Sequence, residues 1–86
     1  MKEVVYSRSA VRKFRRMPRN YSSRVREKIL AYAEDPESQA NNVVRLQGAG
    51  GLLRLRVGDW RVIMRAGDRI EVLHIASRGR AYRGDS

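Results

Sequence analysis

The first part of the chain shows one short strand-like run followed by a helical pattern. The residues from Val4 to Tyr6 are apolar or aromatic, which is typical of a short strand. Ser7 is a candidate N-cap, and the apolar residues that follow it recur at helical spacing: Ala10, Val11, Phe14 and Met17. Pro18 is expected to end this helix, because proline lacks the amide hydrogen that a helix interior needs.

A second amphipathic helix is predicted after Pro18. Asn20 is its candidate N-cap, and one face carries Tyr21, Val25, Ile29 and Tyr32. Asp35-Pro36 is expected to end it, and residues 37–42 are polar and loop-like. The two helices are therefore predicted to form a helical hairpin that packs on an apolar surface, with their charged residues on solvated faces or against an acidic partner.

Beyond residue 51 the pattern changes to strands. Three segments are rich in Leu, Val, Ile and Trp, namely Leu52–Val57, Trp60–Ala66 and Ile70–Ala76. Gly58-Asp59 is a two-residue hairpin turn, and Gly67-Asp68 marks the next turn. The order β-α-α-β-β-β predicts an α+β fold, in which a four-stranded, mostly antiparallel sheet packs on the two helices. We expect residues 1–86 to form one domain, as is usual at this length.

The Gly58-Asp59 turn fixes the pairing of its two strands, with Val57 opposite Trp60 and Arg56 opposite Arg61. Paired residues point to the same face of a sheet, and residues alternate along a strand. One predicted face is apolar and consists of Leu53, Leu55, Val57, Trp60, Val62 and Met64. The other, which we call the arginine face, carries Arg54, Arg56, Arg61 and Arg65.

Arg56 directly opposite Arg61 is expected to destabilise the sheet, because like charges repel across a strand pair. A sheet that retains this pair is expected to bind an anion there, and Arg61→Ala is predicted to leave stability unchanged or slightly higher. The alternative is an ordinary solvated face.

The last strand has two possible registers. Either Val72, His74 and Ala76 share the arginine face, or Leu73 and Ile75 do. We favour the first register, because it leaves Leu73 and Ile75 for the core.

Charge is the strongest signal in the composition. Nineteen Lys and Arg face nine Asp and Glu, which gives a formal net charge of +10, and sixteen of the nineteen are Arg. Arginine pairs bidentately with phosphate and stacks on bases, so the charge favours a nucleic-acid partner. The alternatives are arginine used for solvation, or a basic surface that docks an acidic protein.

Several kinds of chemistry are disfavoured. The chain has no cysteine, which excludes disulfides and thiolate catalysis, and its one histidine, His74, excludes a two-histidine ribonuclease mechanism. His74 is expected to be a structural residue, or one that merely faces the surface of its strand. The carboxylates are scattered, and Gly48–Gly51 lacks the context of a phosphate-binding loop. Any phosphodiester chemistry is therefore expected to need no metal or cofactor and to be carried by Arg and Tyr. No apolar run approaches the ~20 residues of a membrane span, and no signal peptide is apparent, which predicts a cytoplasmic protein.

Several segments, taken in order, resemble the RelE/ParE superfamily of toxins from type II toxin–antitoxin systems. They are Val5-Tyr6-Ser7, Asp35-Pro36, Arg45-Leu46-Gln47-Gly48, Leu53-Arg54-Leu55-Arg56-Val57-Gly58-Asp59-Trp60-Arg61-Val62-Ile63, and the stretch from Ile75 to Tyr82. The chain departs from the family pattern at Leu53, where an aromatic residue is usual, and at Ser77, where many members carry histidine.

The resemblance implies a microbial RNase fold and a ribosome-dependent endoribonuclease of the RelE type. Such a toxin cuts mRNA in the ribosomal A site by attack of a ribose 2′-hydroxyl on the adjacent phosphate. It also implies a cognate antitoxin, encoded by the neighbouring gene. The implied catalytic residues are Arg54, Arg61, Arg78 and Tyr82, and the residues expected to bind substrate are Arg56, Arg65, Arg80 and Arg83.

Two other functions remain open. A ParE-like toxin of the same fold would inhibit DNA gyrase without cutting RNA, and its sheet arginines would be structural or would bind a partner. A module that has lost activity would only bind RNA or protein.

Overall fold

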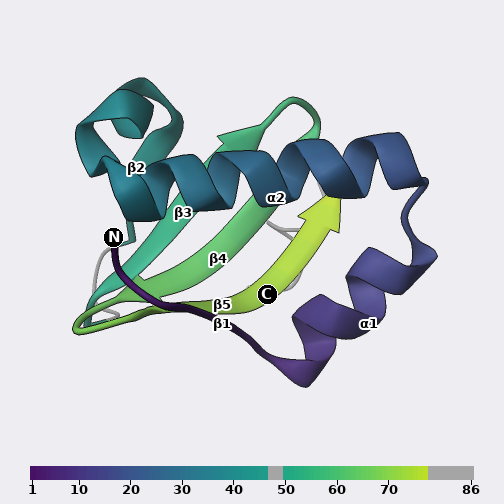
Figure 1. Cartoon of the computed structure of the whole chain (residues 1–86), viewed down its shortest axis with the longest axis horizontal. Coiled ribbons are helices and arrows are strands. Elements are labelled where there is room, and N and C mark those ends of the chain that lie inside the picture. The colour runs from purple at the N-terminus through teal and green to yellow at the C-terminus, as the bar shows by residue number, and fades with distance from the viewer. Residues whose placement is uncertain (47–49, 78–86) are drawn as a thin grey trace.

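The computed structural model describes residues 1–46 and 50–77 and has the predicted α+β architecture (Figure 1). Its helices are α1 (Arg8–Arg16), α2 (Arg19–Glu34) and the 3₁₀ helix η1 (Pro36–Asn42). Its strands are β1 (Val4–Tyr6), β2 (Val43–Arg45), β3 (Leu52–Val57), β4 (Trp60–Ala66) and β5 (Ile70–Ser77). In the part of the chain that is described, no helix is long and apolar enough to cross a bilayer.

The sheet has five strands in the order β1-β5-β4-β3-β2, where four were predicted. The additional strand is β2, which pairs antiparallel with β3 through Val43–Leu55, Val44–Arg54 and Arg45–Leu53. Three residues are too few to show an alternating pattern, so only the pairing with β3 reveals this strand. The parallel β1–β5 pair makes the sheet mixed, and its remaining pairs are antiparallel as predicted.

The helix starts confirm one predicted cap and correct another. The Ala10 amide donates a hydrogen bond of 3.1 Å to Ser7 Oγ, so Ser7 caps α1 as predicted. The Asn20 cap is wrong, because α2 already begins at Arg19 with Pro18 at the N-cap position and no side-chain cap. Residues 37–42, predicted as a loop, belong to η1.

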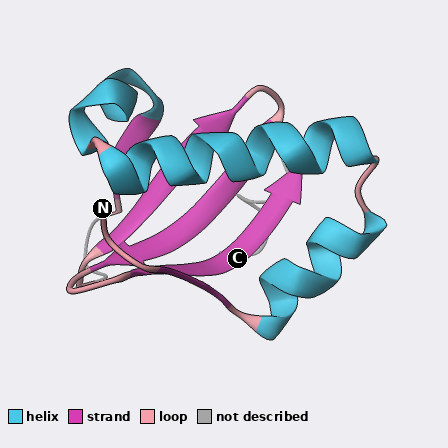
Figure 2. Cartoon of the chain, viewed as in Figure 1, coloured by secondary structure: helices cyan, strands magenta, loops and turns pink. Residues whose placement is uncertain are grey.

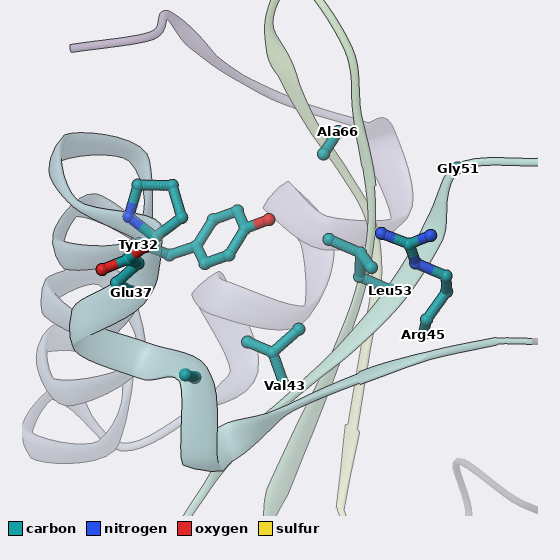
Figure 3. Close-up of a pocket in the computed structure, with 9 residues that line it drawn as sticks. Tyr32, Glu37, Val43, Arg45, Gly51, Leu53 and Ala66 are labelled. Atoms are coloured by element: carbon teal, nitrogen blue, oxygen red, sulfur yellow. The ribbon is translucent and has the colours of Figure 1, made fainter.

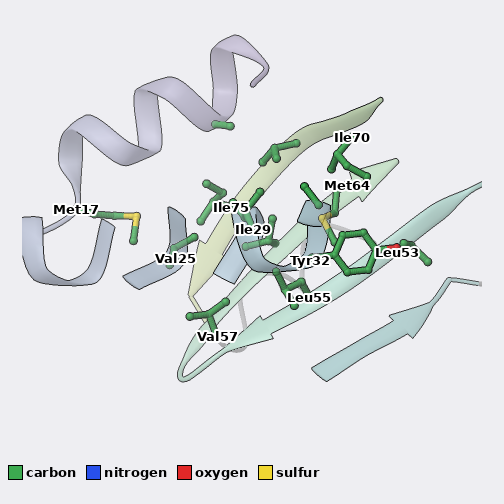
Figure 4. Packing of buried hydrophobic residues seen from close by; sticks show 14 residues of the cluster. Met17, Val25, Ile29, Tyr32, Leu53, Leu55, Val57, Met64, Ile70 and Ile75 are labelled. Carbon is green, nitrogen blue, oxygen red and sulfur yellow. The ribbon is translucent and has the colours of Figure 1, made fainter. Parts of the chain in front are cut away.

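The core lies between α2 and one face of the sheet (Figure 2). Val25 and Ile29 of α2 and Leu55, Val62 and Met64 of the sheet are fully buried there (Figure 4). Full burial of a side chain of this size contributes about 1.5–3 kcal/mol, so these few residues supply much of the stability of a small fold. This packing fixes which face of the β3–β4 hairpin is turned inward.

A β-bulge in the β4–β5 ladder divides β5 into two parts. Ile63 pairs with His74 but the next residue, Met64, pairs with Val72, so Leu73 is the extra residue. His74 therefore lies on the arginine face, as predicted, whereas Val72 is buried in the core, contrary to the favoured register. The bulge shifts the alternation by one residue, which no uniform register can reproduce.

The junction of β1 and α1 is held by aromatic packing. The rings of Tyr6 and Phe14 meet edge to face with centroids 5.5 Å apart, and the Arg26 guanidinium lies 5.4 Å from the Phe14 ring centroid. Burial raises the pKa of the Tyr6 hydroxyl above its ordinary value of 10.0, and the positive charge of Arg26 opposes part of that shift. Tyr6 therefore remains neutral at physiological pH.

Candidate nucleic-acid interface

The β3–β4 hairpin carries the predicted arginine face. Arg56 pairs with Arg61, Val57 pairs with Trp60, and Arg54 pairs with Ile63, which confirms the register predicted from the two-residue turn. Gly58 adopts φ +59°, a conformation that is easy for glycine and rare for other residues. The turn and the core packing together hold these arginines on the side of the sheet away from α2.

Arg61 is on the predicted face but is not exposed. Only 8% of its surface is accessible. Its Nη1 donates hydrogen bonds to the backbone oxygens of Gly58 at 2.9 Å and of Trp60 at 3.0 Å. The guanidinium therefore folds back onto the turn and satisfies two carbonyl groups, so the expectation that its removal leaves stability unchanged does not fit this structure.

Arg56, the cross-strand partner of Arg61, is exposed and is held differently. Its Nη2 donates to Asn42 Oδ1 at 3.4 Å, and Asn42 Nδ2 donates to Gln39 Oε1 at 3.3 Å. Gln39 is buried, with 6% of its surface accessible. A chain of amide groups thus runs from the interior of η1 to the guanidinium of Arg56, which keeps its charge without a carboxylate partner at this contact.

Arg54 and Arg65 occupy different parts of the face. Arg54 is half-buried and lies between Val44 of β2 and Ile63 of β4. Arg65 lies at the other end of β4, where its Nη1 is 3.9 Å from Glu71 Oε1. The structure therefore brings Arg54, Arg56 and Arg61 together near the β3–β4 turn and places Arg65 apart from them.

The remaining predicted site residues, Arg78, Arg80, Tyr82 and Arg83, lie outside the described residues. The last described residue before them is Ser77 at the end of β5, which pairs with Trp60 at the start of β4. The chain therefore leaves the sheet at the end that carries Arg56 and Arg61.

His74 is exposed on the arginine face beside α1. Its Nδ1 lies 3.3 Å from Ser9 Oγ, and the groove around it is also lined by Arg12, Lys13 and Arg16. Within residues 1–46 and 50–77, no group of three or more His, Cys, Asp or Glu side chains is arranged to hold a metal ion.

Two pockets meet at Arg56 and Arg61, and they include residues that the sequence did not single out. One, of about 570 Å³, is lined by Arg24, Lys28, Asn42, Arg56, Val57, Gly58, Asp59 and Arg61. A smaller one, of about 150 Å³, is lined by Asn41, Asn42, Val44, Arg54, Arg56 and Arg61. Asn42 lies in the segment predicted as a loop, and Arg24 and Lys28 belong to a helix charge run, so no sequence signal separated them from ordinary surface residues.

A third pocket, of about 530 Å³, is different in character and lies on the core side of the sheet near its β2 edge (Figure 3). Its walls include Tyr32, Val43 and Leu53, with Arg45 at its margin. Its lining is largely apolar, unlike the two pockets on the arginine face, which are lined by several arginines.

Comparisons with known proteins identify the family and the fold of this chain. Residues 4–82 match the family model described as the ParE toxin of the type II toxin–antitoxin system, parDE. The chain belongs to this toxin family. Its placement in the RelE/ParE superfamily confirms the resemblance drawn from the sequence, and no curated protein matches the chain significantly.

The solved structures similar to this toxin-family chain include several RelE proteins. The archaeal RelE–RelB complex from Pyrococcus horikoshii contains a chain with 27% identity and a TM-score of 0.77, with 92% of this chain and 97% of that chain covered. The isolated RelE toxin of E. coli has 13% identity and a TM-score of 0.76, with 99% and 95% covered. The intact E. coli RelBE complex gives 16% identity and a TM-score of 0.74, with 93% and 100% covered.

Proposed function

We propose that this toxin is a ribosome-dependent endoribonuclease of the RelE type, which cuts mRNA in the ribosomal A site. The observation that carries the proposal is the cluster of Arg54, Arg56 and Arg61 on one sheet face. Arg56 and Arg61 have uncharged oxygen atoms as their hydrogen-bond partners in the structure. Fixed positive charge of this kind stabilises the negative charge that develops on a phosphate during cleavage.

The proposed reaction on the ribosome needs no metal ion and no cofactor. The 2′-oxygen of a ribose forms a bond to the adjacent phosphorus, and the bond from phosphorus to the 5′-oxygen of the next nucleotide breaks. Tyr82 accepts the proton of the 2′-hydroxyl, and Arg78 donates a proton to the leaving 5′-oxygen. The products are a 2′,3′-cyclic phosphate and a 5′-hydroxyl.

Within this proposal the sheet arginines have distinct roles. Arg54 and Arg56 bind the reacting phosphate directly. Arg61 adds positive charge beneath it and holds the β3–β4 turn in place through the Gly58 and Trp60 carbonyl groups. Arg80 and Arg83 bind neighbouring phosphates of the RNA.

Primer extension on mRNA from translating ribosomes tests the proposed function. The toxin is expected to produce new 5′ ends within codons that occupy the A site, and free mRNA is expected to remain intact. Intact mRNA on translating ribosomes, with protein synthesis unaffected, would contradict it.

A second candidate function is inhibition of DNA gyrase. The matching family model is described as that of a ParE toxin. The RelE/ParE superfamily, which this chain resembles, also includes toxins that inhibit gyrase. A supercoiling assay with purified gyrase separates the two functions, since the RelE-type toxin is expected to leave supercoiling unchanged.

We also propose a cytoplasmic antitoxin partner, encoded by the neighbouring gene. Several similar structures are RelE–RelB toxin–antitoxin complexes. A toxin with a net charge of +10 fits an acidic, partly disordered segment that folds as it binds. Copurification of the two proteins at low salt is the expected result, and separate elution would argue against the pairing.

A further inference from the structure

The arginine face continues around the β3–β4 turn onto helix α2. The two pockets that meet there share Asn42, Arg56 and Arg61. The smaller pocket opens over Arg54 on the sheet, and the larger one reaches Arg24 and Lys28 on α2. We call the two pockets together the turn groove, and Figure 1 shows the β3–β4 turn beside α2, where the groove passes.

The charge of the turn groove favours a polyanion. Its α2 part is lined by four cationic side chains, Arg24, Lys28, Arg56 and Arg61, against one carboxylate, Asp59. Arg24 and Lys28 are exposed and four residues apart, so they lie on the same face of α2. Like charges at this spacing destabilise a helix slightly, and a bound anion would relieve that repulsion.

The lining of the groove also indicates which polyanion fits. Its apolar contribution comes from Val57, which is buried in the core, and from Val44 at the β2 edge. A protein segment that folds on binding depends on apolar anchors, and these are scarce here. An RNA strand presents phosphates at regular intervals, which suits cations spaced along a polar path.

We propose that the turn groove holds the backbone of a single RNA strand that runs from the arginine face, past Asn42, to α2. Arg24 and Lys28 contact phosphates away from the one that reacts, and Asn42 positions Arg56 between the two parts of the groove. The proposal rests on the proposed function for the identity of the ligand as RNA, but it concerns residues to which the toxin resemblance assigns no role.

The test measures how salt affects RNA binding by the double variant Arg24→Gln/Lys28→Gln. The probe is a short single-stranded 2′-O-methyl RNA, which cannot be cut by its own 2′-oxygen. Each phosphate contact to a single strand contributes about 0.7 to the slope of log affinity against log salt. Loss of two contacts should lower the slope by about 1.4, which corresponds to ~25-fold weaker binding near 0.1 M salt and equal binding near 1 M.

The control for position is Arg69→Gln, which removes one exposed positive charge from the β4–β5 turn, at the opposite end of the sheet. Its slope should stay close to that of the wild type. Both substitutions at α2 keep good helix formers on the surface, so equal unfolding midpoints should accompany the loss of affinity.

The outcomes separate this inference from the proposed function. A wild type that cuts mRNA on ribosomes, with a double variant whose salt slope matches the control, would overturn the groove and leave the ribonuclease standing. If the wild type does not cut mRNA but the double variant still has a lower salt slope than the wild type, RNA binding in the turn groove would be supported and the ribonuclease function would not. A double variant that binds RNA normally but loses the antitoxin would overturn the proposal and assign these residues to the protein partner.

Discussion

The two ends of the β4 strand both carry arginine on the face away from α2, but the arginines meet different partners. At the β3–β4 turn, Arg61 donates to backbone carbonyl oxygens and Arg56 to the Asn42 amide. At the β4–β5 turn, Arg65 lies beside the carboxylate of Glu71. The first arrangement fixes the positions of guanidinium groups without neutralising them, whereas the second compensates the charge.

Under the proposed function, the β3–β4 turn is the end of this face that binds phosphate, and the β4–β5 turn is not. Sequence alternation places all four arginines on the same side, and it cannot show which charges are compensated. Neutral hydrogen-bond partners leave more of a guanidinium's positive charge available to a phosphate than a carboxylate partner does. The hairpin end is also the end at which the chain leaves β5 toward Tyr82.

The largest expected effect is at Tyr82. If its hydroxyl accepts the 2′-hydroxyl proton at the hairpin end, Tyr82→Phe should slow single-turnover cleavage on the ribosome by ~10²–10⁴, the usual range for general acid–base catalysis. Ribosome affinity should not change. A Tyr82→Phe variant that cuts as fast as the wild type, together with a slow Tyr82→Ala variant, would assign the ring to base stacking instead.

A second pair of substitutions compares the two ends of β4 directly. Arg56→Gln should reduce the cleavage rate by ~10²–10³, the range observed when one preorganised donor to a developing oxyanion is removed. Arg65→Gln, which removes the same charge from the other end, should have little effect on the same rate. Equal losses of cleavage rate in the two variants would show that both ends of the arginine face contribute alike, which would contradict the difference between them.

The smallest effect concerns stability and separates the two arginines of one cross-strand pair. Arg61→Ala should lower the free energy of unfolding by about 1–3 kcal/mol, because it removes two hydrogen bonds to the Gly58 and Trp60 carbonyl groups, each worth about 0.5–1.5 kcal/mol. Arg56→Ala should leave it unchanged or slightly higher, because it removes a like charge opposite Arg61. Urea unfolding midpoints measure both, and similar losses in the two variants would mean that both arginines are structural.

Much of the fold could be predicted from the sequence because local signals were strong. The Gly58-Asp59 turn fixed the β3–β4 register, and the alternation on either side identified the face that packs on α2. Two features depended on nonlocal contacts. The short β2 strand becomes visible only through its pairing with β3, and the bulge at Leu73 shifts β5 without any break in its composition.

The candidate site was predictable at the level of faces but not of individual partners. The pairing of Arg56 with Arg61 followed from the register, whereas the burial of Arg61 depends on two turn carbonyl groups that accept from its side chain. The contact between Asn42 and Arg56 joins residues that are 14 positions apart through the unpredicted β2 pairing. Side-chain direction at the end of a sheet is set by such contacts, which hydrophobic periodicity does not encode.

The chemistry of the cut ends is the most direct test of whether the arginine face supports RNA cleavage by a ribose 2′-hydroxyl. Ribosomes carrying a defined mRNA, with an A-site codon of ribose nucleotides or with one 2′-deoxy substitution at the cleavage position, would be treated with the wild-type toxin. We expect a 2′,3′-cyclic phosphate and a 5′-hydroxyl on the ribose mRNA, and no cut on the substituted one. An uncut ribose mRNA, or equal cleavage of both, would contradict it.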